Sequence, residues 1–264
     1  MSPAKAKLDR LIWDAVRSSS PLTLCLTNHV TANDCANALL AAGASPVMSL
    51  DENDARELAG IASAVVLNIG TADGAQLAAM LGAGRAARRL GKPVVLDPVG
   101  AGATAMRLEA ARRILDEVGP TVIRGNASEI LTLAGAVAGG GQKGVDSVSQ
   151  AGLEALEGAA RRLSESCSAV VAISGPTDVV AEGQKLANVT GGSALMTRIT
   201  GSGCILSSIV AACAGAAPDR PCQATIAAMA LLKEAGSLAE GRLSAPGNLG
   251  EFRVRLMDAI AELA

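Results

Sequence analysis

The residues best suited to bind a charged ligand lie in one short stretch, Thr200-Gly201-Ser202-Gly203-Cys204. An almost wholly apolar run follows directly, which predicts that this stretch leads into a buried helix. Two glycines there would let a ligand approach the backbone, and the free N–H groups and helix dipole favour an anion such as phosphate. A tight turn that feeds a core helix is the alternative interpretation of so short a motif.

Cys204 would occupy the first turn of that helix. A helix N-terminus lowers the pKa of a thiol and favours the thiolate, so Cys204 could be a nucleophile, a base or a group that positions a substrate. The alternative is a small buried apolar residue, which is the commonest role of a free cysteine. That alternative is the expected role of Cys213 and Cys222 in the same region.

A carboxylate is expected at the end of a buried strand. Asp97 follows the apolar run 94–96 and precedes a Pro-Val-Gly turn. Magnesium in proteins is usually held by one or two carboxylates together with waters and phosphate oxygens, which makes Asp97 a candidate ligand. The alternative is an Asp that caps the following turn.

Arg124 and Glu129 come from the next predicted strand and helix, in the stretch 122–130. An arginine at a strand end could bind nucleotide phosphates in a bidentate manner. Glu129, in the first turn of the helix, could be a second, water-mediated metal ligand. It could also form a capping box with Asn126, and the two roles are compatible.

Several functions are disfavoured by the composition. His29 is the only histidine, and its surroundings give no sign of a Ser-His-Asp or Cys-His arrangement, which argues against hydrolase chemistry. No glycine-rich loop ending in Gly-Lys-Ser or Gly-Lys-Thr is present. Aromatic residues make up 1% of the chain and the net charge is −2, so no nucleic-acid partner is expected.

The cysteines and the N-terminal segment indicate the compartment. The six cysteines form no C-x-x-C pair, which argues against zinc and is typical of reduced thiols in the cytoplasm. Met1–Ser20 carries charges among apolar residues at helical spacing, which predicts an amphipathic helix rather than an export signal. The longest apolar stretch, near Cys204, is too short to span a bilayer, so no membrane partner is expected.

The elements that must position these residues alternate along the chain. Short runs of Val, Ile and Leu predict buried strands, and longer stretches between them predict helices. The alternation predicts an α/β fold with helices on both faces of a mostly parallel sheet. No change in composition marks a second domain, and Gly139–Gly144 is predicted to be a flexible loop. The predicted strands are Leu22–Leu26, Pro46–Ser49, Ala64–Ile69, Pro93–Leu96, Thr121–Ile123 and Ala169–Ile173; the predicted helices include Ala32–Ala42, Gly74–Arg89, Ala105–Val118, Leu153–Ser164, Cys204–Ala214, Gln223–Leu238 and Phe252–Leu263.

Polar side chains follow most of the predicted strands. In open parallel sheets, ligands bind beyond the carboxyl ends of the strands, so these side chains should gather along one edge. Loops are polar in general, which is the simpler explanation. One Asp, one Arg and three Asn on the same edge nevertheless favour a site for a polar ligand; they are Asp97, Arg124, Asn28, Asn68 and Asn126.

Six motifs occur in one order: Thr27-Asn28-His29-Val30 with Asn33, Pro46-Val47-Met48-Ser49, Asn68-Ile69-Gly70-Thr71, the stretch 96–102 around Asp97, the stretch 123–130 around Arg124, and Thr200–Cys204. This set resembles the motifs of the hydroxyethylthiazole kinases, a thiamine-salvage family of the ribokinase-like superfamily. The resemblance extends from about Pro21 to the C-terminal segment 252–258.

The resemblance implies a kinase that uses ATP and Mg²⁺ to phosphorylate the hydroxyl of a methyl-hydroxyethyl-thiazole. It also implies one ribokinase-like domain over 1–264, a three-layer α/β/α fold, and trimers with active sites between subunits. Related sugar and pyrimidine kinases carry an Asp base at the position of Cys204. The site residues it implies are Met48, Gly201 and the adjacent Asn28 for the thiazole, Arg124 and Ser174 for ATP, and Asp97 and Glu129 near magnesium.

The chain departs from the family pattern at three places. Ser202 stands where the family usually has Thr, and Ser174 stands where Thr is common; both changes keep a hydroxyl. The segment Thr190-Gly191-Gly192-Ser193 lacks a His that the family often has there.

Three other functions remain as alternatives. The first is another ribokinase-like kinase, such as one acting on hydroxymethylpyrimidine, although Cys at position 204 argues against it. The second is a protein that binds a nucleotide or a thiamine precursor without catalysis. The third is a Rossmann dehydrogenase, which the lack of a G-x-G-x-x-G after the first predicted strand disfavours.

Overall fold

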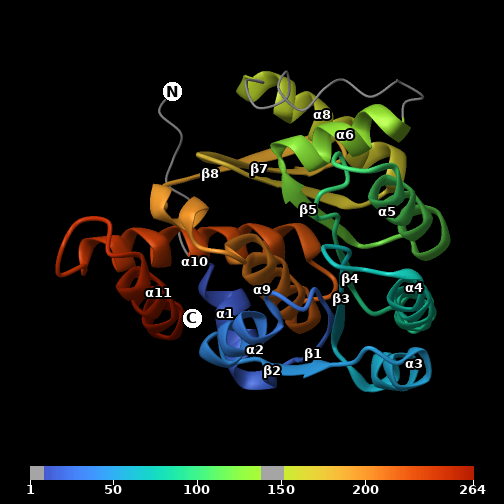
Figure 1. Cartoon of the computed structure of the whole chain (residues 1–264), viewed down its shortest axis with the longest axis horizontal. Helices are drawn as coiled ribbons and strands as arrows, with labels where there is room; N and C mark the ends of the chain where they lie inside the picture. Colours follow the sequence, from blue (N-terminus) through green and yellow to red (C-terminus); the bar gives the residue numbers. More distant parts are fainter. Residues whose placement is uncertain (1–8, 138–151) are drawn as a thin grey trace.

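Eight strands form one sheet in the order β2-β1-β3-β4-β5-β6-β7-β8 (Figure 1). The computed structural model describes residues 9–137 and 152–264. Strands β1 to β6 pair in parallel, and β7 and β8 add to the β6 edge in antiparallel pairing, so the predicted mostly parallel sheet is confirmed. The strands are β1 (Leu22–Leu26), β2 (Ser45–Met48), β3 (Ala64–Asn68), β4 (Val94–Asp97), β5 (Val122–Asn126), β6 (Val170–Ser174), β7 (Thr177–Glu182) and β8 (Lys185–Thr190).

Helices cover both faces of the sheet, which confirms the three-layer α/β arrangement. One face packs against α1 (Arg10–Ser19), α2 (Ala32–Ala41), α9 (Ser202–Ala216), α10 (Pro221–Gly241) and α11 (Leu249–Leu263). The other packs against α3 (Glu52–Ile61), α4 (Gly74–Arg89), α5 (Ala105–Val118), α6 (Ala127–Val137) and α8 (Leu153–Cys167). Each face therefore has its own hydrophobic core.

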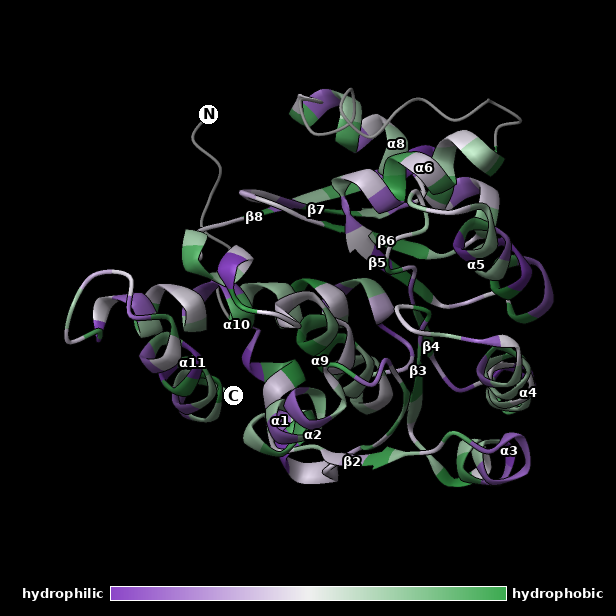
Figure 2. Cartoon of the chain, viewed as in Figure 1, coloured by the Kyte–Doolittle hydropathy of each residue, from purple (hydrophilic) through white to green (hydrophobic). Residues whose placement is uncertain are grey.

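The strands serve both cores because successive side chains point to opposite faces. On β3, Val66 joins one core while Val65 and Leu67 join the other. Both faces of the central strands are apolar as a result, which explains the near-continuous runs of Val, Ile and Leu in the sequence. Hydrophobic residues, green in Figure 2, follow the strands and much of α9. All residues of α9 from Cys204 to Ala214 are buried, as the apolar run predicted.

Local signals in the sequence set several helix ends. The side chain of Asp51 accepts hydrogen bonds from the backbone N–H groups of Asn53 and Asp54 and caps α3. Thr104 caps α5 by accepting from Arg107 N, and α5 ends at Gly119, whose φ of 64° lies in the left-handed region that glycine adopts readily. The caps of α3 and α5 follow β2 and β4, so they fix the loops at the carboxyl ends of these strands, whereas Gly119 leads into the start of β5.

The structure adds elements that the sequence prediction omitted. The β7–β8 hairpin closes through Gly183 and Gln184, and its strands pair from Thr177 with Thr190 to Glu182 with Lys185. Its polar residues break the apolar runs that identified the other strands, because β8 is an edge strand and partly exposed. Helix α3 was also omitted. The predicted loop Gly139–Gly144 lies outside the described residues.

Over residues 9–137 and 152–264, every helix lacks the combination of length and apolar character that a bilayer span requires.

Candidate active site

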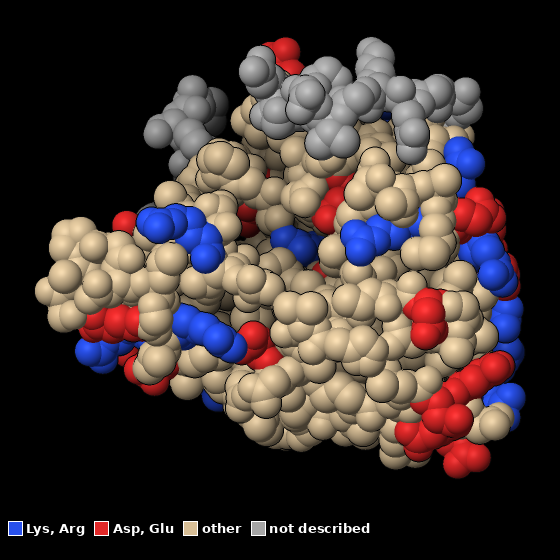
Figure 3. Space-filling view, in the orientation of Figure 1, with Lys and Arg blue, Asp and Glu red and all other residues tan. Residues whose placement is uncertain are grey.

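A cavity of about 660 Å³ lies beyond the carboxyl ends of β4, β5 and β6 and beside the start of α9. Figure 3 shows this face of the molecule hollowed, with both basic and acidic side chains visible inside the hollow. The cavity brings together six residues that the sequence had singled out far apart in the chain. They are Asp97, Arg124, Glu129, Ser174, Gly201 and Cys204.

Two buried asparagine amides connect the strand ends to the start of α9. Asn28 Nδ2 and Asn68 Nδ2 each donate to Cys204 Sγ at 3.2 Å. Asn28 Nδ2 also donates to Asn68 Oδ1 at 3.1 Å, and Asn68 Nδ2 donates to Asp97 Oδ2 at 2.8 Å. Four side chains, from the loop after β1 and from β3, β4 and α9, therefore form one network. Because they are buried and bonded to one another, their positions are fixed before any ligand binds.

Asp97 is fully buried at the end of β4. Its Oδ2 accepts from Asn68 and from Ser207 Oγ at 2.9 Å, whereas Oδ1 has no hydrogen-bond partner. Burial raises the pKa of this carboxyl to about 6, the charge of Arg124 opposes the rise, and the charge of Glu129 adds to it. A buried carboxylate oxygen without a partner on a cavity wall is suited to bind a cation or a hydrogen-bond donor.

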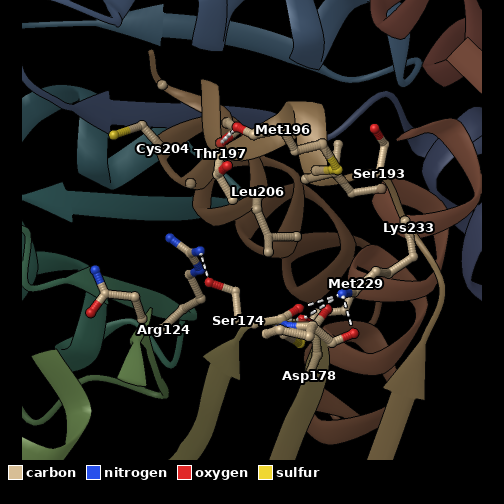
Figure 4. A pocket seen from close by; sticks show the side chains of 18 of the residues that line it. Arg124, Ser174, Asp178, Ser193, Met196, Thr197, Cys204, Leu206, Met229 and Lys233 are labelled. Atoms are coloured by element: carbon tan, nitrogen blue, oxygen red, sulfur yellow. Dashed lines mark hydrogen bonds and ion pairs between the residues drawn. The ribbon is translucent and has the colours of Figure 1, made fainter. Parts of the chain in front are cut away.

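Arg124 places its guanidinium between Asp97 and Ser174. Its Nη2 donates to Ser174 Oγ, its Nη1 lies 4.0 Å from Asp97 Oδ1, and its Nε is buried without a partner (Figure 4). A Cβ at Gly203 would lie 2.7 Å from Nη1, so a side chain at that position would displace the guanidinium. Arg124 thus presents N–H donors to the cavity from a fixed position beside the start of α9.

Glu129 forms the capping box that the sequence suggested. Glu129 Oε2 accepts from Asn126 N at 2.8 Å, and Asn126 Oδ1 accepts from Glu129 N at 3.0 Å. Its other oxygen, Oε1, accepts from Gly100 N at 2.9 Å. The carboxylate therefore ties the loop after β4 to the start of α6, and it also lines the cavity.

The glycine turn takes the conformation that an anion site needs. Gly201 has a φ of 90°, and a Cβ there would lie 2.7 Å from Thr31 Cγ2. Ser202 begins α9, and its hydroxyl donates to the Met196 carbonyl at 2.9 Å, so the hydroxyl is already engaged. The first N–H groups of α9 have no intrahelical partners and lie beside the cavity.

One expectation about Cys204 is wrong. A position near a helix N-terminus predicts a lowered thiol pKa, but burial raises the pKa of Cys204, and the charge of Asp97 raises it further. The hydrogen bonds from Asn28 and Asn68 only partly oppose this rise. Cys204 is consequently a neutral thiol near pH 7, because its charged form would be poorly solvated and would lie close to the charge of Asp97.

Two predicted residues lie outside the cavity lining. Asn28 reaches the site through its bond to Cys204. Met48 ends β2, the edge strand on the far side of β1, and is only partly buried. Three lining or supporting residues received no role from the sequence: Ser207, Asp178 and Lys233. Ser207 could have been found, since it follows Cys204 by three positions and so shares its helix face.

The described part of the chain contains no group of three His, Cys, Asp or Glu side chains that could hold a metal ion by themselves. A divalent cation at Asp97 would thus need further oxygen ligands from water or from phosphate, which is how Mg²⁺ is usually bound in phosphoryl-transfer sites.

Comparison with known proteins identifies the relatives of this chain. The model of the hydroxyethylthiazole kinase family matches residues 13–264. A hydroxyethylthiazole kinase of Nitratidesulfovibrio vulgaris (strain DP4) is 48% identical over 249 residues, which cover 94% of this chain and 90% of that protein. The structure of a hydroxyethylthiazole kinase from Pyrococcus horikoshii OT3 is 35% identical and superimposes with a TM-score of 0.85, covering 96% of this chain and 93% of that one. A ribokinase-like superfamily protein from Enterococcus faecalis V583 shares the fold at 13% identity, with a TM-score of 0.61, covering 100% of this chain and 92% of that one.

Proposed function

The chain belongs to the hydroxyethylthiazole kinase family, and from this membership we propose that it transfers the γ-phosphoryl group of ATP to the hydroxyl of a methyl-hydroxyethyl-thiazole in thiamine salvage. The observation that carries the proposal is the shared cavity, where the guanidinium of Arg124, the unpartnered oxygen of Asp97 and the start of α9 meet. Phosphoryl transfer passes through a loose transition state, so a site that positions groups and stabilises charge is what the reaction needs.

Arg124 and the turn 201–204 are proposed to bind the phosphates of ATP. Support comes from the donors they present: an unpartnered Nε on Arg124 and the backbone N–H groups at the start of α9. Ser174 fixes the guanidinium through the Arg124 Nη2 bond and lines the same cavity. The γ-phosphoryl oxygens would then lie beside Cys204, at the helix N-terminus.

Asp97 and Glu129 are proposed to hold Mg²⁺. The residues fit such an ion, because Asp97 Oδ1 is a buried carboxylate oxygen with no hydrogen-bond partner and Glu129 lines the same cavity. When bound, the ion would neutralise charge on the phosphate oxygens. Both oxygens of Glu129 already accept backbone hydrogen bonds, and a contact with the ion through water would leave these bonds in place. Asn68 and Ser207 orient Asp97 so that Oδ1 remains available.

The acceptor is proposed to bind next to Cys204, with Asn28, Gly201 and Met48 nearby. Cys204 borders the cavity, and Asn28 and Asn68 fix its sulfur. As a neutral thiol, Cys204 would position the acceptor hydroxyl rather than remove its proton. A strong base contributes little when the transition state is loose.

Replacing Cys204 tests that role. Because the thiol positions the hydroxyl, Cys204→Ala should lower kcat by about tenfold, less than the 10²–10⁴-fold that a general base is typically worth. Steady-state kinetics with saturating ATP would measure the change, and Cys213→Ala, in the core of the same helix, is the control for packing. Undiminished turnover would remove Cys204 from the reaction, and a loss above 10²-fold would restore it as a base.

We further propose a single kinase domain over 1–264 that assembles as a trimer in the cytoplasm. One sheet contains all described strands, and all six cysteines are free. Met48 ends β2 at the edge of the sheet, and Leu50, two residues further along the chain, is 54% exposed. A neighbouring subunit that covered this edge would complete the acceptor site. Sedimentation equilibrium should then give three times the mass of one chain; a monomer would contradict the shared site.

The deciding experiment supplies ATP, Mg²⁺ and the thiazole alcohol and detects the phosphorylated thiazole by mass spectrometry. We expect turnover that stops with a chelator and returns with excess Mg²⁺. Hydroxymethylpyrimidine serves as the competing acceptor in a parallel reaction. Turnover of the pyrimidine without turnover of the thiazole would refute the proposed substrate, and ATP binding without any product would indicate a binding protein.

A further inference from the structure

Lys233 borders the cavity at the end that Arg124 and Ser174 line, although no motif contains it. It lies on α10, and its side chain is 12% exposed. Its Nζ donates to the carbonyl oxygens of Gly175 at 2.5 Å and Pro176 at 3.2 Å and lies 3.1 Å from Asp178 Oδ1 (Figure 4). An ammonium group has three N–H donors, and these three acceptors account for all of them.

Two of the acceptors, Gly175 and Pro176, form the turn between β6 and β7, and the third, Asp178, lies at the start of β7. Asp178 Oδ1 also accepts from Gly175 N at 2.9 Å, so the turn is closed on itself before Lys233 ties it to α10. Ser174, the last residue of β6, lies directly before this turn and accepts the hydrogen bond of Arg124. A shift of the turn would therefore move the serine that fixes the guanidinium.

The stem of Lys233 lies against Gly192, another residue of the cavity lining. A Cβ at Gly192 would lie 2.8 Å from Lys233 Cδ, and Gly192 has a φ of +88°. One turn further along α10, Ser237 Oγ accepts from Gly192 N at 3.1 Å. Gly191 and Gly192 both line the cavity, so Lys233 contacts two segments of its lining.

Lys233 also determines the charge of this part of the site. Asp178 is 2% exposed and lines the cavity. Burial raises the pKa of its carboxyl, and the charge of Lys233 is the main effect that opposes the rise. An unpaired carboxylate on this wall would repel an anionic ligand, because charges in a poorly solvated site interact strongly.

We propose that Lys233 is a positioning residue for the nucleotide: it fixes the β6–β7 turn against Gly191–Gly192 and thereby holds Ser174 and Arg124 where they bind ATP. This role rests on the proposed use of ATP and does not depend on which alcohol accepts the phosphoryl group. Since its donors are already engaged, Lys233 does not itself bind the phosphates. The same contact explains the glycine at 192, because a side chain there would displace the lysine.

Calorimetric titration with ATP and Mg²⁺, without an acceptor, tests the proposal. Lys233→Met keeps the stem and removes the ammonium, and we expect the Kd for ATP to rise about tenfold, with the KM for the acceptor unchanged in steady-state assays. The control is Lys185→Met, which removes an exposed lysine from the neighbouring hairpin and should leave the Kd unchanged. An unchanged Kd in Lys233→Met, or an equal rise in the KM values of both substrates, would overturn the proposal.

A second variant separates positioning from stability. Lys233→Met leaves Asp178 buried and unpaired, which by itself can unfold a protein. Lys233→Met/Asp178→Asn removes both charges, and we expect its unfolding midpoint to return close to that of the wild type while the Kd for ATP stays raised at least fivefold. Recovery of the wild-type Kd would show that Lys233 only neutralises Asp178. Loss of the fold would show that the two residues mainly stabilise the core. Either result would overturn the proposal.

A wild-type protein that binds ATP but does not phosphorylate the thiazole alcohol would refute the proposed acceptor alone. The titrations would still test Lys233 in that case, because they contain no acceptor.

Discussion

Asp97→Asn is expected to lower kcat by about 10²–10³-fold while the protein remains folded. The substituted amide keeps one oxygen to accept from Asn68 and Ser207, so the local geometry should persist. It loses the negative charge at the position of Oδ1, which is proposed to hold the cation. Steady-state kinetics at saturating ATP and Mg²⁺ would measure the loss, with Asp219→Asn, an exposed residue between α9 and α10, as the control.

Although it lowers kcat, Asp97→Asn should raise the free energy of unfolding near neutral pH. The pKa of Asp97 is raised from 3.8 to about 6 in the folded protein, chiefly by burial. Between pH 3.8 and pH 6, Asp97 is ionised in the unfolded chain but still protonated in the folded protein, so the free energy of unfolding falls as pH rises. The total loss, complete above pH 6, is on the order of 3 kcal/mol. Asn carries no proton to release.

Urea unfolding without Mg²⁺ or nucleotide, at pH 4 and pH 7, would test this effect. Asp97→Asn should match the wild type at pH 4 and exceed its stability at pH 7. A variant less stable than the wild type at pH 7 would show that the Asp97 charge supports the fold. A variant with full activity would remove Asp97 from the proposed cation site.

Arg124→Lys is expected to raise the KM for ATP by about 10- to 100-fold, although it conserves the charge. The guanidinium reaches Ser174 with Nη2 and faces Asp97 with Nη1, and a single ammonium cannot occupy both positions. Hydrogen bonds to charged groups contribute about 1.5–3 kcal/mol, which corresponds to that range of affinity. Isothermal titration with ATP would check the change independently of turnover.

The control for Arg124→Lys is Arg85→Lys. Arg85 forms an exposed ion pair with Glu117, which should contribute little, and neither residue lines the cavity. If Arg124→Lys raised only the KM of the acceptor, Arg124 would belong to the acceptor side of the site rather than to the phosphates.

Much of the candidate site could be predicted from the order of the chain alone. Strand ends in a parallel sheet meet at one edge, so Asp97, Arg124 and Ser174 could be expected together once their strands were recognised. The capping box of Glu129 with Asn126 was visible because it depends on residues three positions apart. The buried helix after Gly201 was visible because its apolar run is continuous. All of these depend on local pattern or on a general rule of sheet topology.

The omitted elements show where such patterns fail. The β7–β8 hairpin adds to the β6 edge, and one of its strands is partly exposed, so its sequence lacks the apolar run that marks a buried strand. Its register, from Thr177 with Thr190 to Glu182 with Lys185, is set by the two-residue turn at Gly183 and Gln184. Asp178, which lines the cavity through this hairpin, was omitted with it.

The layered α/β fold, the family and the edge of the sheet that carries the polar residues could be predicted from the sequence, because periodicity and motif order are properties of neighbouring residues. How the side chains act on one another could be seen only in the folded protein. Asn28 and Asn68 meet Cys204 across 176 and 136 residues, and burial beside Asp97 raises the pKa of the thiol. Lys233 meets the β6–β7 turn across 58 residues. Desolvation and charge depend on every group that packs around a side chain, and no local pattern contains that information.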